Sequence, residues 1–302
     1  MNKSEINICG ITFKNPIIAA SGTFGYGREY STYYNLSLLG GISTKGTTVK
    51  QRNGNATPRI AETPSGMLNS VGLQNPGVDY FIQKELPFLK KFDTVIIANI
   101  AGESIAEYAA AAEKLNKTNV DMIEVNISCP NVSEGGMAFG VSALAAGNVT
   151  KAVRDATDKP IAIKLSPNVT DVAAIAKVVE SEGADCISLI NTLLGMRIDI
   201  KTRRPVLKNN YGGLSGRAVF PIALRMVNQV ARAVKVPVIG MGGISSAEDA
   251  VEMLLAGASA VQVGTEIITD PFAPIKIIEG LEEYCDKINT TIPELTGKVA
   301  LW

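Results

Sequence analysis

Short apolar runs rich in β-branched residues recur along the chain, and amphipathic stretches of helical period follow them. This alternation is typical of successive βα units around a parallel sheet. The expected strands span residues 16–20, 41–45, 94–100, 121–127, 160–165, 185–190, 236–240 and 258–263. Because eight parallel strands can close on themselves, the pattern predicts an α/β fold of the (β/α)8 or TIM barrel type.

Amphipathic runs between these strands are predicted to form helices, at residues 104–115, 142–156, 172–182, 218–234, 247–255 and 272–285. Serines near three of the starts are expected to act as caps: Ser104, Ser142 and Ser246. A small N-terminal β-hairpin, residues 6–9 and 11–13 joined through Gly10, is expected to plug the bottom of the barrel.

Two connections, residues 46–93 and 191–217, are too long for simple turns. Loops of that length in a compact domain are usually functional, so we expect long active-site loops. Neither a linker nor a low-complexity tract divides the chain, and residues 1–302 are therefore expected to form a single barrel domain.

The charge balance disfavours several classes of partner. Basic and acidic residues number 29 each, and neither forms a long run, so nucleic acid and a membrane surface are not expected partners. The four cysteines contain no C-x-x-C pair, which argues against a metal site or an iron–sulfur cluster held by this chain alone. The first residues lack the apolar stretch of a signal peptide, and we expect a cytoplasmic protein.

Polar residues and glycines follow the expected strands at their carboxyl ends, where barrel active sites lie. They are Ser21, Gly22, Thr44, Lys45, Asn99, Asn126, Lys164, Asn191, Gly242, Gly243, Gly264 and Thr265. A single asparagine after a strand is more often a turn former than a ligand. Two lysines and three asparagines at one mouth, however, rarely coincide by chance, and the set predicts a binding site.

The turns after the seventh and eighth strands, residues 240–244 and 264–265, are rich in glycine. A glycine-rich turn alone is weak evidence, because glycine also serves tight turns. Barrels commonly bind phosphate through backbone N–H groups at this pair of turns, so a phosphate-bearing ligand is expected.

The chain contains no histidine, so proton transfer near neutral pH falls to cysteine, lysine, a carboxylate or water. Cys129 is the leading candidate, because it follows the fourth strand in a loop where a thiol could be exposed and partly deprotonated. Cys9, Cys186 and Cys285 lie in apolar runs and are expected to pack. No G-x-G-x-x-G fingerprint occurs, and any NAD would therefore bind outside this chain.

Several motifs, in order along nearly the whole chain, resemble those of the dihydroorotate dehydrogenases. They are Ala-Ser-Gly at 20–22, Ser-Thr-Lys at 43–45, Asn-Ser-Val-Gly-Leu-Gln-Asn-Pro-Gly at 69–77, Asn-Ile-Ser-Cys-Pro-Asn at 126–131 and the two phosphate turns. The resemblance implies oxidation of (S)-dihydroorotate to orotate in pyrimidine biosynthesis. One tightly bound FMN per chain would take the hydride, and Cys129 would be the base.

A cysteine as the base resembles class 1 of this family, since the membrane-associated class has serine and an apolar N-terminal extension. The stretch Val-Ser-Glu-Gly-Gly-Met-Ala-Phe-Gly at 132–140 resembles the NAD-linked class 1B. That class implies a partner subunit carrying FAD and an iron–sulfur cluster, and a homodimer of this chain as the core of a heterotetramer. The fumarate-reducing class 1A and a related FMN-dependent dihydropyrimidine dehydrogenase stay open as alternatives.

The resemblance also implies roles for residues at matching positions. Catalytic roles fall to Cys129 and Lys45. The implied substrate contacts are Lys45, Asn69, Gly72, Leu73, Asn126, Asn131, Asn191 and Thr192. The implied FMN contacts are Ser21, Thr44, Lys45, Asn99, Asn126, Lys164, Ile190, Gly216, Gly242, Gly243, Gly264 and Thr265. Amide side chains suit a ring of alternating donors and acceptors, and lysine suits developing negative charge.

Two further readings keep the barrel without this chemistry. In one, a phosphate-binding isomerase or aldolase uses Lys164 to form a Schiff base. In the other, the barrel is a noncatalytic scaffold, which the complete polar set at the strand ends disfavours. The colour of the purified protein separates the first reading from a flavoprotein, because only FMN makes it yellow.

Overall fold

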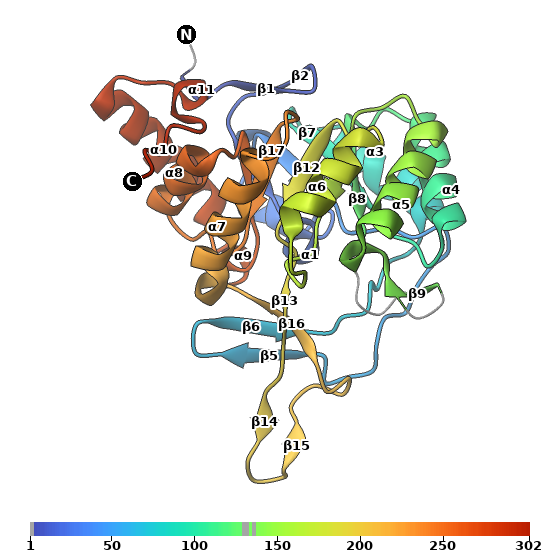
Figure 1. The fold of residues 1–302 in the computed structure, drawn as a ribbon. Coiled ribbons are helices and arrows are strands. Elements are labelled where there is room, and N and C mark those ends of the chain that lie inside the picture. The colour runs from blue at the N-terminus through green and yellow to red at the C-terminus, as the bar shows by residue number, and fades with distance from the viewer. Residues whose placement is uncertain (1–2, 129–132, 135–136) are drawn as a thin grey trace.

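The computed structural model describes residues 3–128, 133–134 and 137–302. Eight parallel strands pair in chain order and close into a barrel, which confirms the predicted fold (Figure 1). They are β3 (Ile17–Ala19), β4 (Gly41–Ser43), β7 (Val95–Ile100), β8 (Met122–Asn126), β11 (Ile161–Lys164), β12 (Cys186–Leu189), β17 (Val238–Met241) and β18 (Ala260–Val263). Within the described ranges, no helix is both long and apolar enough to cross a membrane.

The barrel strands are buried at every position except Asn126, the last residue of β8. Continuous burial is expected where side chains on one face fill the barrel and those on the other pack under helices. This is why these strands read as apolar runs in the sequence rather than as an alternation.

A ring of helices surrounds the barrel (Figure 1). The longer ones are α4 (Ile105–Asn116), α5 (Ala143–Ala156), α6 (Val172–Ser181), α7 (Phe220–Ala231), α8 (Ala247–Ala256) and α10 (Ala273–Ile288). All six confirm predicted helices, and three begin as expected: the side chains of Ser104, Ser142 and Ser246 each accept a backbone N–H three residues later.

Some helix bounds differ from the prediction for a local reason. Helix α7 starts at Phe220 rather than at 218, because Gly216 has a positive φ of 102° and the 3-10 turn η5 (Arg217–Val219) follows it. Helix α10 runs to Ile288 and ends where Asn289 adopts the left-handed conformation. The remaining short elements are α1 (Ser21–Phe24), η1 (Tyr30–Thr32), η2 (Leu36–Leu38), η4 (Phe139–Val141), α9 (Glu266–Thr269) and α11 (Ile292–Leu295).

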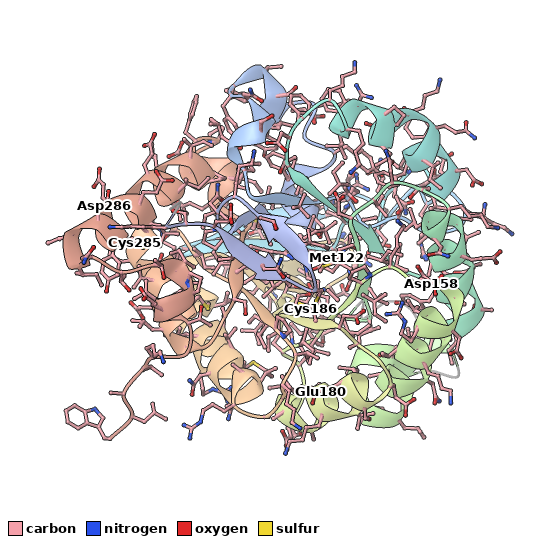
Figure 2. The ribbon with its side chains drawn as sticks, turned by 90° about the horizontal axis from the view of Figure 1, so that it is seen from above. Met122, Asp158, Glu180, Cys186, Cys285 and Asp286 are labelled. Carbon is pink, nitrogen blue, oxygen red and sulfur yellow. The ribbon has the colours of Figure 1, made fainter. Side chains whose placement is uncertain are left out.

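The predicted N-terminal hairpin is present as β1 (Ile6–Ile8) and β2 (Ile11–Phe13). It lies across the amino-terminal end of the barrel, which Figure 2 views face on. Ile8 and Phe13 are fully buried, and the Cys9 thiol donates to the backbone oxygen of Asp185, at 3.2 Å, just before β12. The hairpin therefore covers the bottom of the barrel, as expected.

The three described cysteines are free thiols. Cys186 and Cys285 are buried, in agreement with the packing role predicted for them. Cys9 differs, because the turn of the hairpin leaves it only partly buried.

Two aspartates tie neighbouring barrel strands together. Asp121, just before β8, accepts the backbone N–H of Ile96 in β7 at 2.7 Å. Asp185, just before β12, accepts the N–H of Ile161 in β11 at 2.8 Å. Each carboxylate thus pairs a strand N–H at the end of the barrel where the ladder of hydrogen bonds runs out.

The two long connections contain structure that the sequence reading did not predict. Residues 46–93 include β5 (Ile60–Thr63), β6 (Gly66–Asn69) and the helical segment α2 (Val78–Tyr80), η3 (Phe81–Glu85) and α3 (Leu86–Leu89). Residues 191–217 include β13 (Leu193–Gly195), β14 (Ile198–Asp199), β15 (Arg204–Pro205) and β16 (Gly212–Ser215). A further short pair, β9 (Ser133–Glu134) and β10 (Met137–Ala138), follows β8.

Strands from both connections combine into one antiparallel sheet, in the order β13-β16-β6-β5. This sheet lies beyond the carboxyl ends of the barrel strands, opposite the N-terminal hairpin (Figure 1). We call it the cover sheet. Its position explains why these loops are long: they build one wall of the barrel's mouth.

Candidate active site

A cavity of about 510 Å³ lies at the carboxyl ends of the barrel strands, bounded on its outer side by the cover sheet. Most of the predicted site residues line it: Ser21, Lys45, Asn69, Gly72, Leu73, Asn99, Asn126, Lys164, Ile190, Asn191, Thr192, Gly216, Gly242, Gly243, Gly264 and Thr265. These residues come from segments spread over most of the chain, and the barrel brings them to one place.

Of the three remaining predicted site residues, one does not line the cavity and two lie outside the described ranges. The Thr44 side chain is fully buried behind the mouth, where its Oγ accepts the backbone N–H of Asn99 at 3.3 Å. Cys129 and Asn131 lie outside the described residues. Their roles stay predictions.

A second cavity, of about 660 Å³, lies near the opposite end of the barrel, beside the starts of β17 and β18. Aliphatic side chains and backbone make up much of its lining, with Arg232 and Lys235 among the charged groups. It contains none of the residues that the motifs singled out. The mouth is therefore the candidate active site, despite the larger volume of this second cavity.

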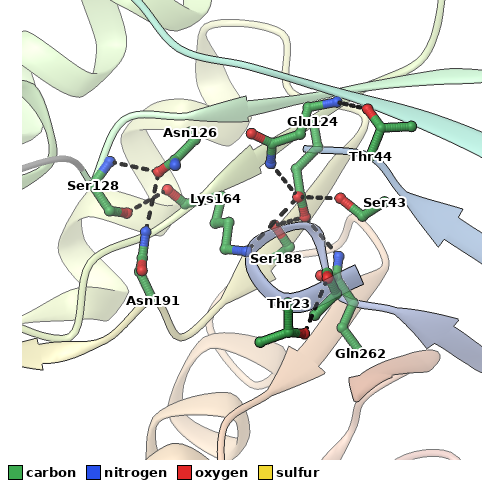
Figure 3. Close-up of polar contacts among 12 residues, drawn as sticks. Thr23, Ser43, Thr44, Glu124, Asn126, Ser128, Lys164, Ser188, Asn191 and Gln262 are labelled. Carbon is green, nitrogen blue, oxygen red and sulfur yellow. Dashed lines mark hydrogen bonds and ion pairs between the residues drawn. The ribbon is translucent and has the colours of Figure 1, made fainter. Parts of the chain in front are cut away.

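Asn126 organises one side of the mouth (Figure 3). Its Oδ1 accepts the backbone N–H of Ser128 at 3.2 Å and the side-chain NH2 of Asn191 at 3.1 Å. The Ser128 hydroxyl in turn donates to the backbone oxygen of Lys164 at 2.8 Å. These contacts fix two of the predicted substrate asparagines relative to each other and hold the residue that precedes Cys129 in the chain.

The cover sheet brings Asn69, at the end of β6, to the wall of the mouth. Its NH2 group donates to the backbone oxygen of Gly213 in β16 at 3.4 Å. Gly72 and Leu73 follow in the chain, and both have positive φ, of 74° and 54°. The backbone turns sharply there, so that residues 69–73 all line the cavity.

The turns after β17 and β18 form a further part of the wall. Gly243 has a φ of 77°, and a Cβ at this position would lie 2.8 Å from the backbone nitrogen of Phe220, so only glycine fits. The Thr265 hydroxyl donates to the Ser215 hydroxyl at 2.8 Å, which joins the turn after β18 to the cover sheet. Backbone N–H groups in such turns suit an anionic ligand.

Beneath the mouth, inside the barrel, lies a carboxylate that the sequence reading missed. Glu124 in β8 is completely buried and accepts four side-chain hydrogen bonds (Figure 3). The donors are Ser43 (2.8 Å), Asn99 (2.6 Å), Ser188 (2.8 Å) and Gln262 (2.7 Å). The ammonium nitrogen of Lys164 lies 3.8 Å from the carboxylate.

Burial alone would raise the pKa of Glu124. The attraction of the Lys164 ammonium and the hydrogen bonds from Ser43, Ser188 and Asn99 outweigh it, and the pKa lies below its ordinary value. Glu124 is therefore ionised at neutral pH, with Lys164 as its partner charge.

Two buried acceptors beside this carboxylate have no partner in the described structure, the side-chain oxygens of Asn99 and Gln262. Both residues are almost fully buried, and both line the cavity. A buried polar atom without a hydrogen bond is costly, so this pair indicates a ligand that carries donor groups. Among the described residues, no cluster of three potential metal ligands occurs.

The signal for Glu124 was present in the sequence as a charged residue inside the apolar strand Met-Ile-Glu-Val-Asn. Its partners could not be found locally, since Ser43, Asn99, Ser188 and Gln262 belong to four other strands. Only closure of the barrel brings them together.

Comparison with known proteins agrees with the geometry. The model of the dihydroorotate dehydrogenase family matches residues 3–285. The chain belongs to this family. The predicted resemblance is thereby confirmed.

The curated relatives are similar over almost their entire length. A protein of Anoxybacillus flavithermus is 52% identical over 300 residues, covering 99% of this chain and 96% of the relative. One of Parabacteroides distasonis is 54% identical over 299 residues, with 98% of each chain covered. One of a Thermoanaerobacter species is 56% identical over 280 residues, with 93% of each covered. All three are named catalytic subunit of dihydroorotate dehydrogenase B (NAD(+)).

Proposed function

We propose that this chain is the catalytic subunit of an NAD-linked dihydroorotate dehydrogenase, which oxidises (S)-dihydroorotate to orotate in pyrimidine biosynthesis. The observation that carries the proposal is the identity of 52–56% to proteins named as that subunit, over nearly the whole chain. The cavity at the barrel's mouth supports it independently, since it collects the residues that such a reaction requires.

FMN is the proposed cofactor, one per chain. When bound, it supplies an acceptor for the hydride that leaves the substrate. The cavity suits a flavin ring, because Asn99 and Gln262 hold unpaired acceptor oxygens and Lys45 and Lys164 bring positive charge to the same wall. Ser21 and Ile190 would border the ring as further contacts. Thr44, which is buried behind the cavity wall, would contribute to the site indirectly.

The cofactor's phosphate would lie against the glycine turns. Gly216, Gly242, Gly243, Gly264 and Thr265 all line the cavity and present backbone rather than bulky side chains. Backbone N–H groups bind phosphate well because they donate without a side chain between them and the anion. One such group of turns fits the single phosphate of FMN.

The substrate would be held by amides from both sides of the mouth. Asn126 and Asn191 come from the barrel side, Asn69 comes from the cover sheet, and Thr192 lies beside Asn191. Asn131 is the fourth proposed amide contact. Amides suit a pyrimidine ring because each offers both a donor and an acceptor. A ligand that left one of these amide groups without a hydrogen bond would bind more weakly. Lys45 would pair with the substrate carboxylate.

Cys129 is the proposed base, which removes the proton from the ring carbon next to the carbonyl while the hydride leaves. It follows Ser128, whose backbone N–H and hydroxyl are bonded to Asn126 and Lys164 at the cavity wall. A thiol has a reference pKa of about 8.5, so the rate should rise with pH as Cys129 ionises. In Cys129→Ser the rate should fall and this rise should disappear, and an unchanged pH profile of the rate would remove Cys129 from the role.

The electrons would pass to NAD through a partner subunit that carries FAD and an iron–sulfur cluster. The term "catalytic subunit" in the relatives' names supports a partner. We further propose that the 302 residues form one FMN-binding domain, that two copies form the core of a heterotetramer, and that the complex works in the cytoplasm.

The test is to purify the chain alone and with its coexpressed partner. The chain should be yellow, and dihydroorotate should bleach its flavin absorbance in the absence of oxygen. Only the complex should reduce NAD. Fumarate reduction by the isolated chain would assign it to class 1A instead, uracil turnover would assign it to the dihydropyrimidine dehydrogenases, and a colourless protein without flavin would overturn the proposal.

A further inference from the structure

The carboxylate of Glu124 is saturated with donors on both oxygens. Its Oε2 accepts from Ser43 and Asn99, and its Oε1 accepts from Ser188 and Gln262. A carboxylate has about four lone-pair sites and no donor of its own while ionised. Every neighbouring group must therefore turn its hydrogen toward Glu124, and none can turn its oxygen there.

This requirement fixes the orientation of the two amides. Since Asn99 and Gln262 give their NH2 groups to Glu124, their oxygens are left on the other side, and both are buried without a partner. The Asn99 oxygen lies against Gly46, where a Cβ would come within 2.7 Å of it, and Gly46 also lines the cavity. The carboxylate thus determines that this part of the cavity offers acceptors.

The same carboxylate acts on the charge of the cavity floor. Lys164 lines the cavity and is almost fully buried, with its ammonium 3.8 Å from Glu124. The negative charge of Glu124 therefore offsets the positive charge of Lys164 for any ligand above them. In a buried setting such charges act strongly, because little water screens them.

Barrel folds do not in general need a carboxylate in their interior. Barrel interiors are normally filled with branched apolar side chains, and an apolar group of similar volume in place of a buried ion pair is often neutral or stabilising. Glu124 also carries four neutral donors that an apolar residue would make unnecessary. The carboxylate, through the two amides and the lysine that it holds at the cavity wall, therefore indicates a role in ligand binding.

We propose that Glu124 is a positioning residue that sets the hydrogen-bonding polarity and the charge of the surface facing the flavin ring, and that Gln262 is a further cofactor contact held by it. The inference rests on the proposed function only in naming FMN as the ligand. Glu124 touches neither ring nor substrate and acts through Asn99, Gln262 and Lys164.

The decisive variant is Glu124→Gln, which keeps the shape and removes the charge. Asn99 and Gln262 donate to different oxygens of Glu124, and glutamine presents an NH2 group in place of one of them, so it cannot accept from both amides in this geometry. Either Asn99 or Gln262 must then turn its NH2 group away from position 124, and Lys164 loses its counter charge. FMN should bind at least tenfold more weakly in its oxidised form.

Loss of the negative charge should also favour reduced FMN, which carries the additional electron density. An at least tenfold rise in the ratio of affinities for reduced over oxidised FMN corresponds to a midpoint potential about 30 mV more positive for a two-electron couple. The two readouts are a titration of the apoprotein with FMN and a spectroscopic redox titration, and neither depends on turnover of dihydroorotate.

Ser188→Ala is the matched control. It removes one neutral donor to Glu124, at 2.8 Å, but keeps the charge and both amide orientations, and Ser188 is absent from the cavity wall. Its FMN affinity and potential should equal those of the wild type. If the network served only the fold, both variants would instead lose stability, and their FMN affinities and potentials would change together.

A second variant keeps the test decisive if Glu124→Gln does not fold. Gln262→Met removes one acceptor from the cavity floor while Glu124 retains its charge, and FMN should again bind more weakly. The inference would be overturned if both variants kept the wild-type FMN affinity and potential, or if Gln262→Met did so when Glu124→Gln does not fold. Either result would leave the proposed function intact. A wild-type chain that binds no FMN would overturn both.

Discussion

The most direct test of the proposed phosphate site is Gly264→Ala, because this substitution changes the cavity without straining the protein. Gly264 follows β18 and lines the cavity, and its φ lies outside the left-handed region. A Cβ at this position would meet only the Cβ of Ala20, at 3.5 Å, which is an ordinary contact. The new methyl group therefore costs the folded chain nothing.

The magnitude follows from what the methyl group displaces. If the phosphate of FMN lies against the backbone of this turn, the methyl group holds it away from at least one N–H donor. A hydrogen bond to a charged group contributes about 1.5–3 kcal/mol. At about 1.4 kcal/mol per factor of ten, the dissociation constant of FMN should rise roughly 10- to 150-fold. Replacement of glycine by alanine at a compatible φ should leave apoprotein stability unchanged or raise it by about 0.4–1 kcal/mol.

The assay is a fluorescence titration of the apoprotein with FMN, paired with urea unfolding of the same apoprotein. Riboflavin, which lacks the phosphate, is the matched ligand: its affinity should change little between the wild type and Gly264→Ala. Wild-type affinity for FMN in the variant would refute the placement of the phosphate at this turn. An equal loss of affinity for both ligands would refute it as well, because the methyl group would then act on the ring.

Two further predictions concern stability. The pKa of Glu124 lies below its ordinary value of 4.5. The ionised carboxylate therefore adds to the free energy of unfolding above pH 4.5, and this contribution is lost as pH falls through the lower pKa of the folded state. In urea unfolding between pH 6 and 3, the free energy of unfolding of the wild type should fall by up to about 1.4 kcal/mol per pH unit more than that of Glu124→Gln. Parallel plots of unfolding free energy against pH would contradict this. Asp121→Ala removes the acceptor for the Ile96 N–H and should cost about 1–3 kcal/mol in urea unfolding. Lys90→Met removes only the ion pair of Asp121, so its cost should stay below about 1 kcal/mol, and equal costs would assign the effect to the ion pair.

The parts of the fold that sequence predicted are those whose cause is local. Each barrel strand is buried on both faces and therefore reads as an apolar run, and Ser104 and Ser142 mark helix starts because a cap needs only a neighbouring N–H. The cover sheet has no such local cause. Strand β6 pairs with β16, which follows most of the barrel strands in the sequence, and neither strand has a distinctive sequence pattern.

The residues of the site also differ in whether local sequence features determine their positions. Lys45, Asn126 and Lys164 could be predicted because the ends of parallel strands meet at one edge, so position in the sequence gives position in space. Thr44 shows the limit of that rule, since its side chain turns inward and binds the Asn99 backbone instead of lining the cavity. Glu124 was missed because its environment depends on four strands at once.

The cover sheet also determines the order in which the molecule can be completed during synthesis. Asn69 in β6 and its partner Gly213 in β16 are 144 residues apart. At roughly 5–20 residues per second, one edge of β6 waits about 7–30 s on the ribosome before its partner strand exists. An exposed strand edge is prone to aggregation, so the nascent chain carries this risk throughout the interval. A chain truncated before β16 would also lack β17 and β18, so that neither the barrel nor the wall of the cavity could be completed.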